Sequence, residues 1–231
     1  MSEDTSVRLN KYLALQLGIS RREADDLIEK GRVTVDQSVA QLGSRFAPHS
    51  IVKVDGKPIS VEAKPYIYLA LHKPAGYVCS RKQQGDAPTI YDLLPPDLHE
   101  LKAVGRLDKD SSGLILLSND GDFAFRMTHP KFQKTKVYRV TLNTDLQPLH
   151  QQMIGEFGVS LEDGVSQLSL MRLSDHNRHE WQVTMSEGRN RQIRRTFASL
   201  GYSVVDLHRV QFGSYSLDDI KKGEYKLVDM R

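Results

Sequence analysis

Residues 105–117 read GRLDKDSSGLILL. The second part, residues 114–117, is an unbroken aliphatic run, which is typical of a strand buried on both faces of a sheet. The first part is polar and bounded by glycines, so it predicts a loop that meets the edge of that sheet. A carboxylate in such a loop, Asp108, is placed to point into a cleft. Taken alone, the local pattern favours a plainer role, in which Asp108 caps a turn.

A second carboxylate in the loop, Asp110, raises the question of a metal site. No histidine or third carboxylate stands at ligand spacing nearby, so the sequence predicts no bound metal. The single cysteine, Cys79, excludes an internal disulfide framework and any site built from several thiolates. It follows apolar residues and is expected to be a small buried thiol.

Further strand and helix patterns surround this stretch. Strands are predicted at residues 67–71, 114–118, 136–142 and 181–185. Helices are predicted over residues 122–128 and 190–200, the second closed by Gly201. The expected fold class is α+β, with a mixed, mainly antiparallel sheet and flanking helices.

The amino-terminal segment, residues 7–60, is expected to form a separate small helical module. Leu9, Leu13 and Leu17 recur every four residues and predict one helix with an apolar face. Ser20 and Glu23 form a capping box that starts a second helix. Short strands follow at residues 33–35 and 51–54, and Asp55-Gly56 predicts a turn.

A short linker, residues 61–66, is expected to separate this module from a larger domain, residues 67–231. No apolar run approaches 18 residues, so no membrane span is predicted. The first residues are polar and acidic, unlike a secretory signal peptide, and the cytoplasm is the expected compartment. A net charge of +3 permits an anionic partner without requiring one.

Cationic side chains suggest nucleic-acid contacts in the amino-terminal module. Residues 1–60 hold nine Lys or Arg and eight Asp or Glu, so an RNA-binding surface would have to be one face of the module. The charges alone leave an ordinary solvated pair of helices as the alternative. The candidate RNA-binding residues of the module are Arg8, Lys11, Arg21, Arg22, Lys30 and Arg32.

Four arginines cluster before the last predicted helix, at Arg189, Arg191, Arg194 and Arg195. Cations at a helix amino terminus oppose the helix dipole, so they need another partner. A phosphate backbone or a buried carboxylate would serve, and Arg194 has the reach to form a bidentate pair with Asp108.

The amino-terminal module resembles the small RNA-binding domain named after ribosomal protein S-four. The similarity rests on RLNK at 8–11, SRREA at 20–24, GRVTVD at 31–36 and VDGKP at 54–58. Asn10 stands where that family often has Asp. Asp36-Gln37 stands where it usually has Asn-Gly, so a less tight first turn is expected.

The larger domain resembles the bacterial ribosomal RNA pseudouridine synthases, in the group of small-subunit synthase A and large-subunit synthases B, E and F. Ser111-Ser112 replaces the Thr-rich pair common there, and the hydroxyls are kept. The matching pieces are HKPAGY at 72–77, GRLD through GL at 105–114, NDG at 119–121, HP at 129–130, KVY at 136–138, EGR through R at 187–195 and LHRV at 207–210.

The resemblance implies roles for five residues. Asp108 matches the essential carboxylate, acting as nucleophile or general base, and Arg194 matches its basic partner. Tyr138 matches the residue that stacks on the target base, and Leu207 an apolar residue beside the uracil. For these two, plain core packing remains the alternative. Arg106 is the candidate to fill the gap left by a flipped base.

The implied reaction converts a uridine of ribosomal RNA to pseudouridine. It is an isomerisation, so no cofactor is expected. The implied partner is ribosomal RNA or an assembling ribosomal subunit, and the chain is expected to be a monomer. Phosphate contacts are assigned to Arg189, Arg191, Arg195 and the amino-terminal module.

Two other functions fit parts of the sequence. A non-catalytic RNA-binding or ribosome-assembly protein that keeps the fold would have no need of Asp108, Tyr138 and Arg194 together. A small-molecule hydrolase using Asp108 and Asp110 would leave the amino-terminal module and the arginine cluster unexplained.

Overall fold

The computed structural model describes residues 6–59, 65–81, 83 and 85–231. It forms two compact units, Met1–Tyr66 with Asn119–Gly121, and Ile67–Ser118 with Asp122–Arg231. Most of the linker predicted at 61–66 lies outside the described residues. Within the described part of the chain, no helix is both long enough and apolar enough to cross a bilayer.

The smaller unit contains the two helices expected from the sequence. The predicted capping box is present: the Glu23 N–H donates to Ser20 Oγ at 3.1 Å, and the Ser20 N–H donates to Glu23 Oε2 at 2.7 Å. Leu9 and Leu13 are buried, but Leu17 is 40% exposed because the helix ends there, so its assignment to the apolar face was wrong. The elements are α1 (Leu9–Leu17), α2 (Arg21–Glu29), a strand pair β1 (Val7–Arg8) and β4 (Arg45–Phe46), and a sheet of β2 (Val33–Val35), β3 (Ser38–Val39), β5 (Val52–Val54) and β6 (Lys57–Pro58).

The turn at Asp36-Gln37 corrects one expectation. Val35 pairs with Ser38, so the turn has only two residues, and both adopt left-handed backbone angles, with φ of 48° and 73°. This is as tight as the Asn-Gly turn it replaces. Aspartate tolerates the left-handed region, and here Asp36 Oδ1 also accepts the Ile51 N–H at 2.8 Å, which holds the turn against the next strand.

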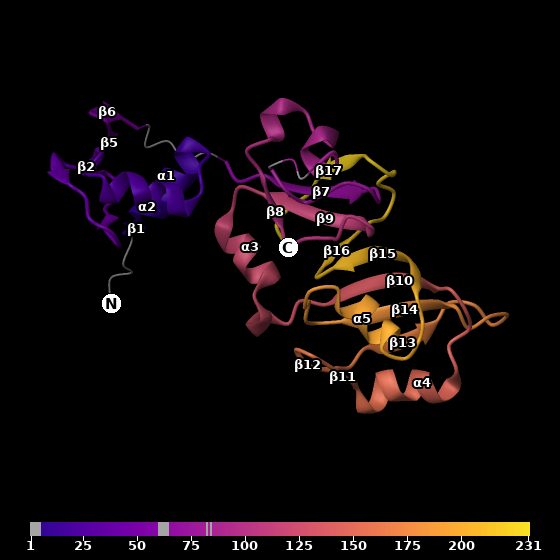
Figure 1. The fold of residues 1–231 in the computed structure, drawn as a ribbon. Helices are drawn as coiled ribbons and strands as arrows, with labels where there is room; N and C mark the ends of the chain where they lie inside the picture. Colours follow the sequence, from indigo (N-terminus) through magenta and orange to yellow (C-terminus); the bar gives the residue numbers. More distant parts are fainter. Residues whose placement is uncertain (1–5, 60–64, 82, 84) are drawn as a thin grey trace. The chain divides into compact units, whose positions relative to one another are not determined.

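The larger unit is built on a nine-stranded sheet, in the order β13-β14-β10-β15-β9-β7-β17, with β8 beside β9 and β16 beside β15 (Figure 1). Every strand pair is antiparallel except β9 with β15, which confirms the mixed, mainly antiparallel sheet. The strands are β7 (Tyr68–Lys73), β8 (Lys102–Val104), β9 (Ser112–Ser118), β10 (Lys136–Leu142), β13 (Ser169–Arg172), β14 (Glu180–Met185), β15 (Val204–Phe212), β16 (Tyr215–Ser216) and β17 (Tyr225–Leu227).

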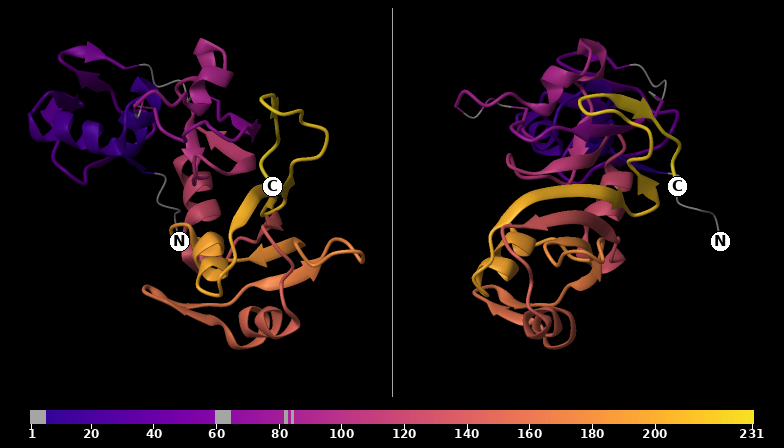
Figure 2. Two further views of the ribbon diagram at one scale, coloured as in Figure 1. Left: turned by 45° about the vertical axis from the view of Figure 1, so that its right-hand side comes forward. Right: turned by 90° about the vertical axis from the view of Figure 1, so that its right-hand side faces the viewer.

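Helices and short turns of helix flank the sheet (Figure 2). The helix expected at 190–200 is shorter, because Arg191 has left-handed angles, with φ of 47°, and helical geometry begins only after it. The flanking elements are α3 (Gly121–Thr128), α4 (Pro148–Gln152), α5 (Gln192–Ala198), the 3-10 turns Ile90–Leu93, Pro96–Leu98 and Pro130–Phe132, a π-helical turn Met153–Phe157, and a hairpin of β11 (Val159–Leu161) and β12 (Gly164–Ser166).

The aliphatic run at 114–117 lies on β9 and is buried on both faces, as predicted. Leu114 and Leu116 contribute to a core with Phe123 of α3. Ile115 and Leu117 contribute to a second, larger core that also includes Phe197 of α5. The strand therefore separates two cores, and the loop before it is fixed by packing on both sides of the sheet.

Candidate active site

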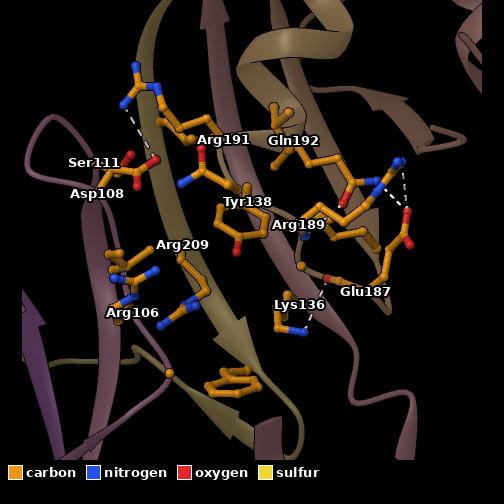
Figure 3. Close-up of a pocket in the computed structure, with 18 of the residues that line it drawn as sticks. Arg106, Asp108, Ser111, Lys136, Tyr138, Glu187, Arg189, Arg191, Gln192 and Arg209 are labelled. Atoms are coloured by element: carbon orange, nitrogen blue, oxygen red, sulfur yellow. Dashed lines mark hydrogen bonds and ion pairs between the residues drawn. The ribbon is translucent and has the colours of Figure 1, made fainter. Parts of the chain in front are cut away.

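An open pocket of about 350 Å³ lies in the larger unit (Figure 3). Four parts of the chain line it: the loop that precedes β9, the end of α3 with the turn after it, the facing side chains of β10 and β15, and the segment between β14 and α5. These parts come from both halves of the sheet. The pocket therefore depends on the pairing of β9 with β15, which joins the two halves.

A buried lysine holds the backbone of the loop that carries Asp108. Lys73, at the end of β7, is fully buried, and its Nζ donates to the carbonyl oxygens of Ser111 at 2.6 Å, Pro74 at 3.0 Å and Asp108 at 3.1 Å. Burial lowers the pKa of Lys73. Because the backbone of Asp108 is fixed in this way, its carboxylate, whose side chain is 34% exposed, is presented to the pocket (Figure 3). Lys73 lies within the HKPAGY motif at 72–77, but that motif implied no role for it.

The strands β10 and β15 place a set of side chains on one face. Tyr138 pairs with Arg209, and Val137 pairs with Gln211, so Val210 is an extra residue that forms a β-bulge. Alternation along the strands puts Leu207 and Arg209 on the pocket side. The bulge shifts that alternation, so that Phe212 also faces the pocket although it is three residues beyond Arg209.

Tyr138 and Leu207 fit both roles that the sequence left open, which are core packing and contact with the target base. Their exposed fractions are 8% and 6%, and both belong to the larger core. Both also line the pocket, as does the exposed Arg106. The structure thus brings Asp108, Arg106, Tyr138 and Leu207 into one cavity.

The structure does not contain the expected bidentate pair between Arg194 and Asp108. Arg191 Nη1 lies 3.5 Å from Asp108 Oδ2, and Arg191 also donates to both oxygens of Asp110 at 3.0 and 2.8 Å. The bond from Arg191 lowers the pKa of Asp110. Arg194 donates to the carbonyl oxygens of Val204 at 2.7 Å and Asp110 at 2.9 Å. Arg191 precedes α5 and faces the loop, whereas Arg194 lies one turn along the helix, beside the start of β15 and outside the pocket lining.

The other two arginines of the cluster share a carboxylate that the sequence did not identify. Asp163, in the turn between β11 and β12, accepts from Arg195 at 2.6 and 3.0 Å and from Arg189 at 2.9 Å. The bond from Arg195 lowers the pKa of Asp163. Arg189 lines the pocket and Arg195 does not. Only the tertiary fold brings Asp163 to this point, so no local signal could have found it.

The module's candidate cations all lie in the smaller unit. Lys30 forms an ion pair with Asp26 at 2.7 Å. Arg32 forms a bidentate pair with Asp55 at 2.8 and 2.5 Å, which lowers the pKa of Asp55. The remaining four are at β1, on α1 and in the first turn of α2, namely Arg8, Lys11, Arg21 and Arg22.

No three His, Cys, Asp or Glu side chains of the described residues gather as metal ligands would. This geometry does not contradict the prediction that Asp108 and Asp110 bind no metal. Cys79 is partly buried, and its Sγ lies 3.4 Å from the main chain of Leu107. Burial raises the pKa of this thiol, as expected for a packed rather than a reactive cysteine.

Comparison with known proteins identifies the family of each part of the chain. Residues 67–199 match the family model for RNA pseudouridylate synthase, and residues 7–52 match the model for the S4 domain. Two relatives named "Ribosomal small subunit pseudouridine synthase A" are similar along nearly their whole length. The Yersinia pestis protein is 36% identical, covering 95% of this chain and 94% of its own, and the Escherichia coli K12 protein is 37% identical, covering 95% of each.

A solved structure is also similar in fold. The crystal structure of a pseudouridylate synthase has a TM-score of 0.68 and 32% sequence identity, and it covers 97% of this chain and 96% of its own. The family model spans more than half of the chain, and the two relatives match 95% of it. The chain therefore belongs to the RNA pseudouridylate synthase family and carries an S4 domain at its amino terminus.

Proposed function

We propose that this enzyme converts one uridine of small-subunit ribosomal RNA to pseudouridine, with Asp108 as the essential carboxylate. The target is suggested by the names of the relatives that match 95% of the chain. The role of Asp108 rests on one observation above the others. Its loop backbone is fixed by Lys73, while its carboxylate is presented to a pocket that Tyr138 and Leu207 also line.

The pocket suits the chemistry of the isomerisation. The bond between uracil N1 and ribose C1′ breaks, the uracil turns, and its C5 forms a new bond to the same ribose carbon. The proton leaves C5, and N1 gains a proton in its place. Atoms and redox state are unchanged, so the reaction requires no cofactor. Asp108 acts at the sugar as a nucleophile or at the base as a general base, and Arg191, at 3.5 Å, is its cationic partner in place of Arg194.

The other pocket residues have roles in holding the base. The flat ring of Tyr138 stacks on the uracil, and Leu207 packs beside it. The target nucleotide must leave its stack to reach Asp108, which costs about a few kcal/mol. Arg106, exposed at the pocket, enters the space that the base leaves, while Arg189, Arg191 and Arg195 compensate through phosphate contacts.

We assign RNA affinity to the small module, residues 7–60, and chemistry to residues 67–231. Each has its own core: the module's buried cluster holds residues such as Leu9, Ile28 and Val52, and neither core of the larger unit includes them. A monomer acting in the cytoplasm is the simplest form of this proposal.

Deleting residues 1–60 is expected to weaken RNA binding by about 10-fold or more and to flatten its salt dependence, since phosphate contacts are lost. The larger unit keeps its cores, so the rate at saturating RNA should fall much less than the affinity. Filter binding at several salt concentrations and single-turnover kinetics measure the two quantities. An unchanged affinity after the deletion would contradict this division of labour.

The proposed function is tested by mapping pseudouridines after incubation with the full-length protein. Unmodified small- and large-subunit RNAs, and assembling subunits of both kinds, serve as substrates. We expect one new pseudouridine, in the small-subunit RNA or its particle. A new site only in large-subunit RNA would refute the subunit assignment. Tight RNA binding with no new pseudouridine on any substrate would favour the non-catalytic RNA-binding alternative.

A further inference from the structure

The pocket contains a buried cation that forms no ion pair with any residue that the structure describes. Arg209 is only 2% exposed, and its Nε donates to the Leu114 carbonyl at 2.8 Å. Its Nη2 is buried and has no hydrogen-bond partner, and no ion pair joins Arg209 to any described carboxylate. Lys73, the other buried cation nearby, donates to three carbonyl oxygens. A buried charge left without a partner is costly, so Arg209 points to a partner that comes from outside the chain.

A second cation lies near Arg209. Lys136, on the adjacent strand, is partly buried, and burial together with the charge of Arg209 lowers the pKa of Lys136. Both cations lie over the ring of Phe212, whose centroid is 4.8 Å from Arg209 Cζ and 5.4 Å from Lys136 Nζ. Figure 3 shows these two cations and Arg106 on one side of the pocket, away from the end where Asp108 meets Arg191.

Glu187, a carboxylate that lines the pocket near Lys136, already has partners. Lys136 Nζ contacts Glu187 through its main-chain carbonyl, at 3.2 Å. The Glu187 side chain instead accepts from Gln192 and lies 3.4 Å from Arg189 Nη2. The charge of Glu187 acts on Lys136, but Glu187 is shared with Arg189, and Arg209 forms no ion pair with a described carboxylate, so this end of the pocket keeps an excess of positive charge.

We propose that Arg209 and Lys136 form a phosphate-binding subsite inside the pocket, which holds a backbone phosphate attached to the flipped uridine. A phosphate brings a full negative charge and several acceptor oxygens, which suit an unpaired guanidinium N–H and an ammonium group. A uracil carbonyl would satisfy a hydrogen bond but leave both charges unbalanced. The subsite rests on the proposed function, because it assumes that the flipped nucleotide enters with its base toward Asp108.

The subsite is tested first with uridine, uridine 5′-monophosphate and uridine 3′-monophosphate, bound to the full-length protein and followed by NMR titration. One of the two monophosphates is expected to bind at least about 10-fold more tightly than uridine. In Lys136→Gln this advantage should shrink several-fold, while uridine binding stays unchanged. In Arg209→Lys it should shrink as well.

A matched control is Lys131→Gln. Lys131 lies over the rings of Phe125 and Phe132 and does not line the pocket. It should keep the full advantage of the monophosphate. Equal binding of uridine and both monophosphates by the wild type would overturn the subsite. So would a Lys136→Gln variant that weakens uridine and the monophosphates equally, because Lys136 would then contact the base.

The second test uses substrate RNA with one neutral methylphosphonate at either phosphate of the target uridine. At the phosphate held by the subsite, this change should raise KM several-fold and leave kcat nearly unchanged, and Lys136→Gln should then add no further increase. Additive effects at both phosphates would overturn the subsite. An enzyme that forms no pseudouridine would refute the proposed function, whereas the nucleotide titrations would still decide whether the subsite exists.

Discussion

Replacing Asp108 with asparagine is expected to lower the rate of pseudouridine formation by at least about 100-fold. An amide can neither serve as a general base nor form the covalent bond that a carboxylate nucleophile would form. The fold should survive, because the loop is held by the bond from Lys73 to the main chain of Asp108, and the side chain makes only a 3.5 Å ion pair with Arg191. Single-turnover kinetics and RNA binding on the same preparation separate lost chemistry from lost affinity.

The matched control is Asp110→Asn, two residues further along the same loop. Asp110 accepts the bidentate bond from Arg191, so its loss should loosen that arginine and reduce the rate by about 10-fold, far less than the loss of Asp108. Equal losses of rate in the two variants would contradict the special role of Asp108. They would indicate instead that pseudouridine formation needs both carboxylates.

The parts of the fold that could be predicted are those fixed by local chemistry. The run at 114–117 forms a strand because its side chains are apolar on both faces. The second helix begins directly after Ser20 because Ser20 and Glu23 satisfy each other's backbone N–H groups. In each case the residues that specify the structure are neighbours in the sequence.

The pairing of the arginines could not be predicted because it depends on backbone geometry and on distant residues. Arg191 reaches Asp108 and Asp110 from a left-handed position before α5, which no pattern in the sequence signals. Asp163 meets Arg189 and Arg195 only because the hairpin of β11 and β12 folds against α5. The sequence therefore indicated that the cations need partners, but not which ones.

The role of β15 was missed for a related reason. Residues 207–210 match a family motif, but no sequence pattern predicted the nine-residue strand that contains them. The bulge at Val210 breaks the alternation, so Arg209 and Phe212 share a face in spite of their odd spacing. A period-two pattern cannot reveal such a pair. The resemblance named Tyr138 and Leu207, which line the pocket, but gave no role to Arg209, which lines it as well.

Gly113→Ala is expected to destabilise the larger unit by about 3 kcal/mol or more, the combined cost of overpacking and a left-handed backbone. Gly113 pairs with Arg209 where β9 and β15 run parallel, and its φ is 108°. A Cβ there would lie 2.2 Å from the Arg209 carbonyl oxygen and 2.5 Å from its nitrogen. Both neighbours are backbone atoms of a central strand, so the clash can be relieved only by moving β9 and β15 apart.

Gly201→Ala is the matched control. Gly201 also has a positive φ, 87°, but an added Cβ would meet nothing within 4 Å, so only the backbone cost of about 1 kcal/mol applies. Urea denaturation of both variants measures the difference, and similar midpoints would show that β9 and β15 have room to adjust. Because β9 follows the Asp108 loop while Tyr138 lies in the other half of the sheet, separating the strands should also move the carboxylate away from the base. Any folded Gly113→Ala protein is therefore expected to lose activity, whereas Gly201→Ala should keep it.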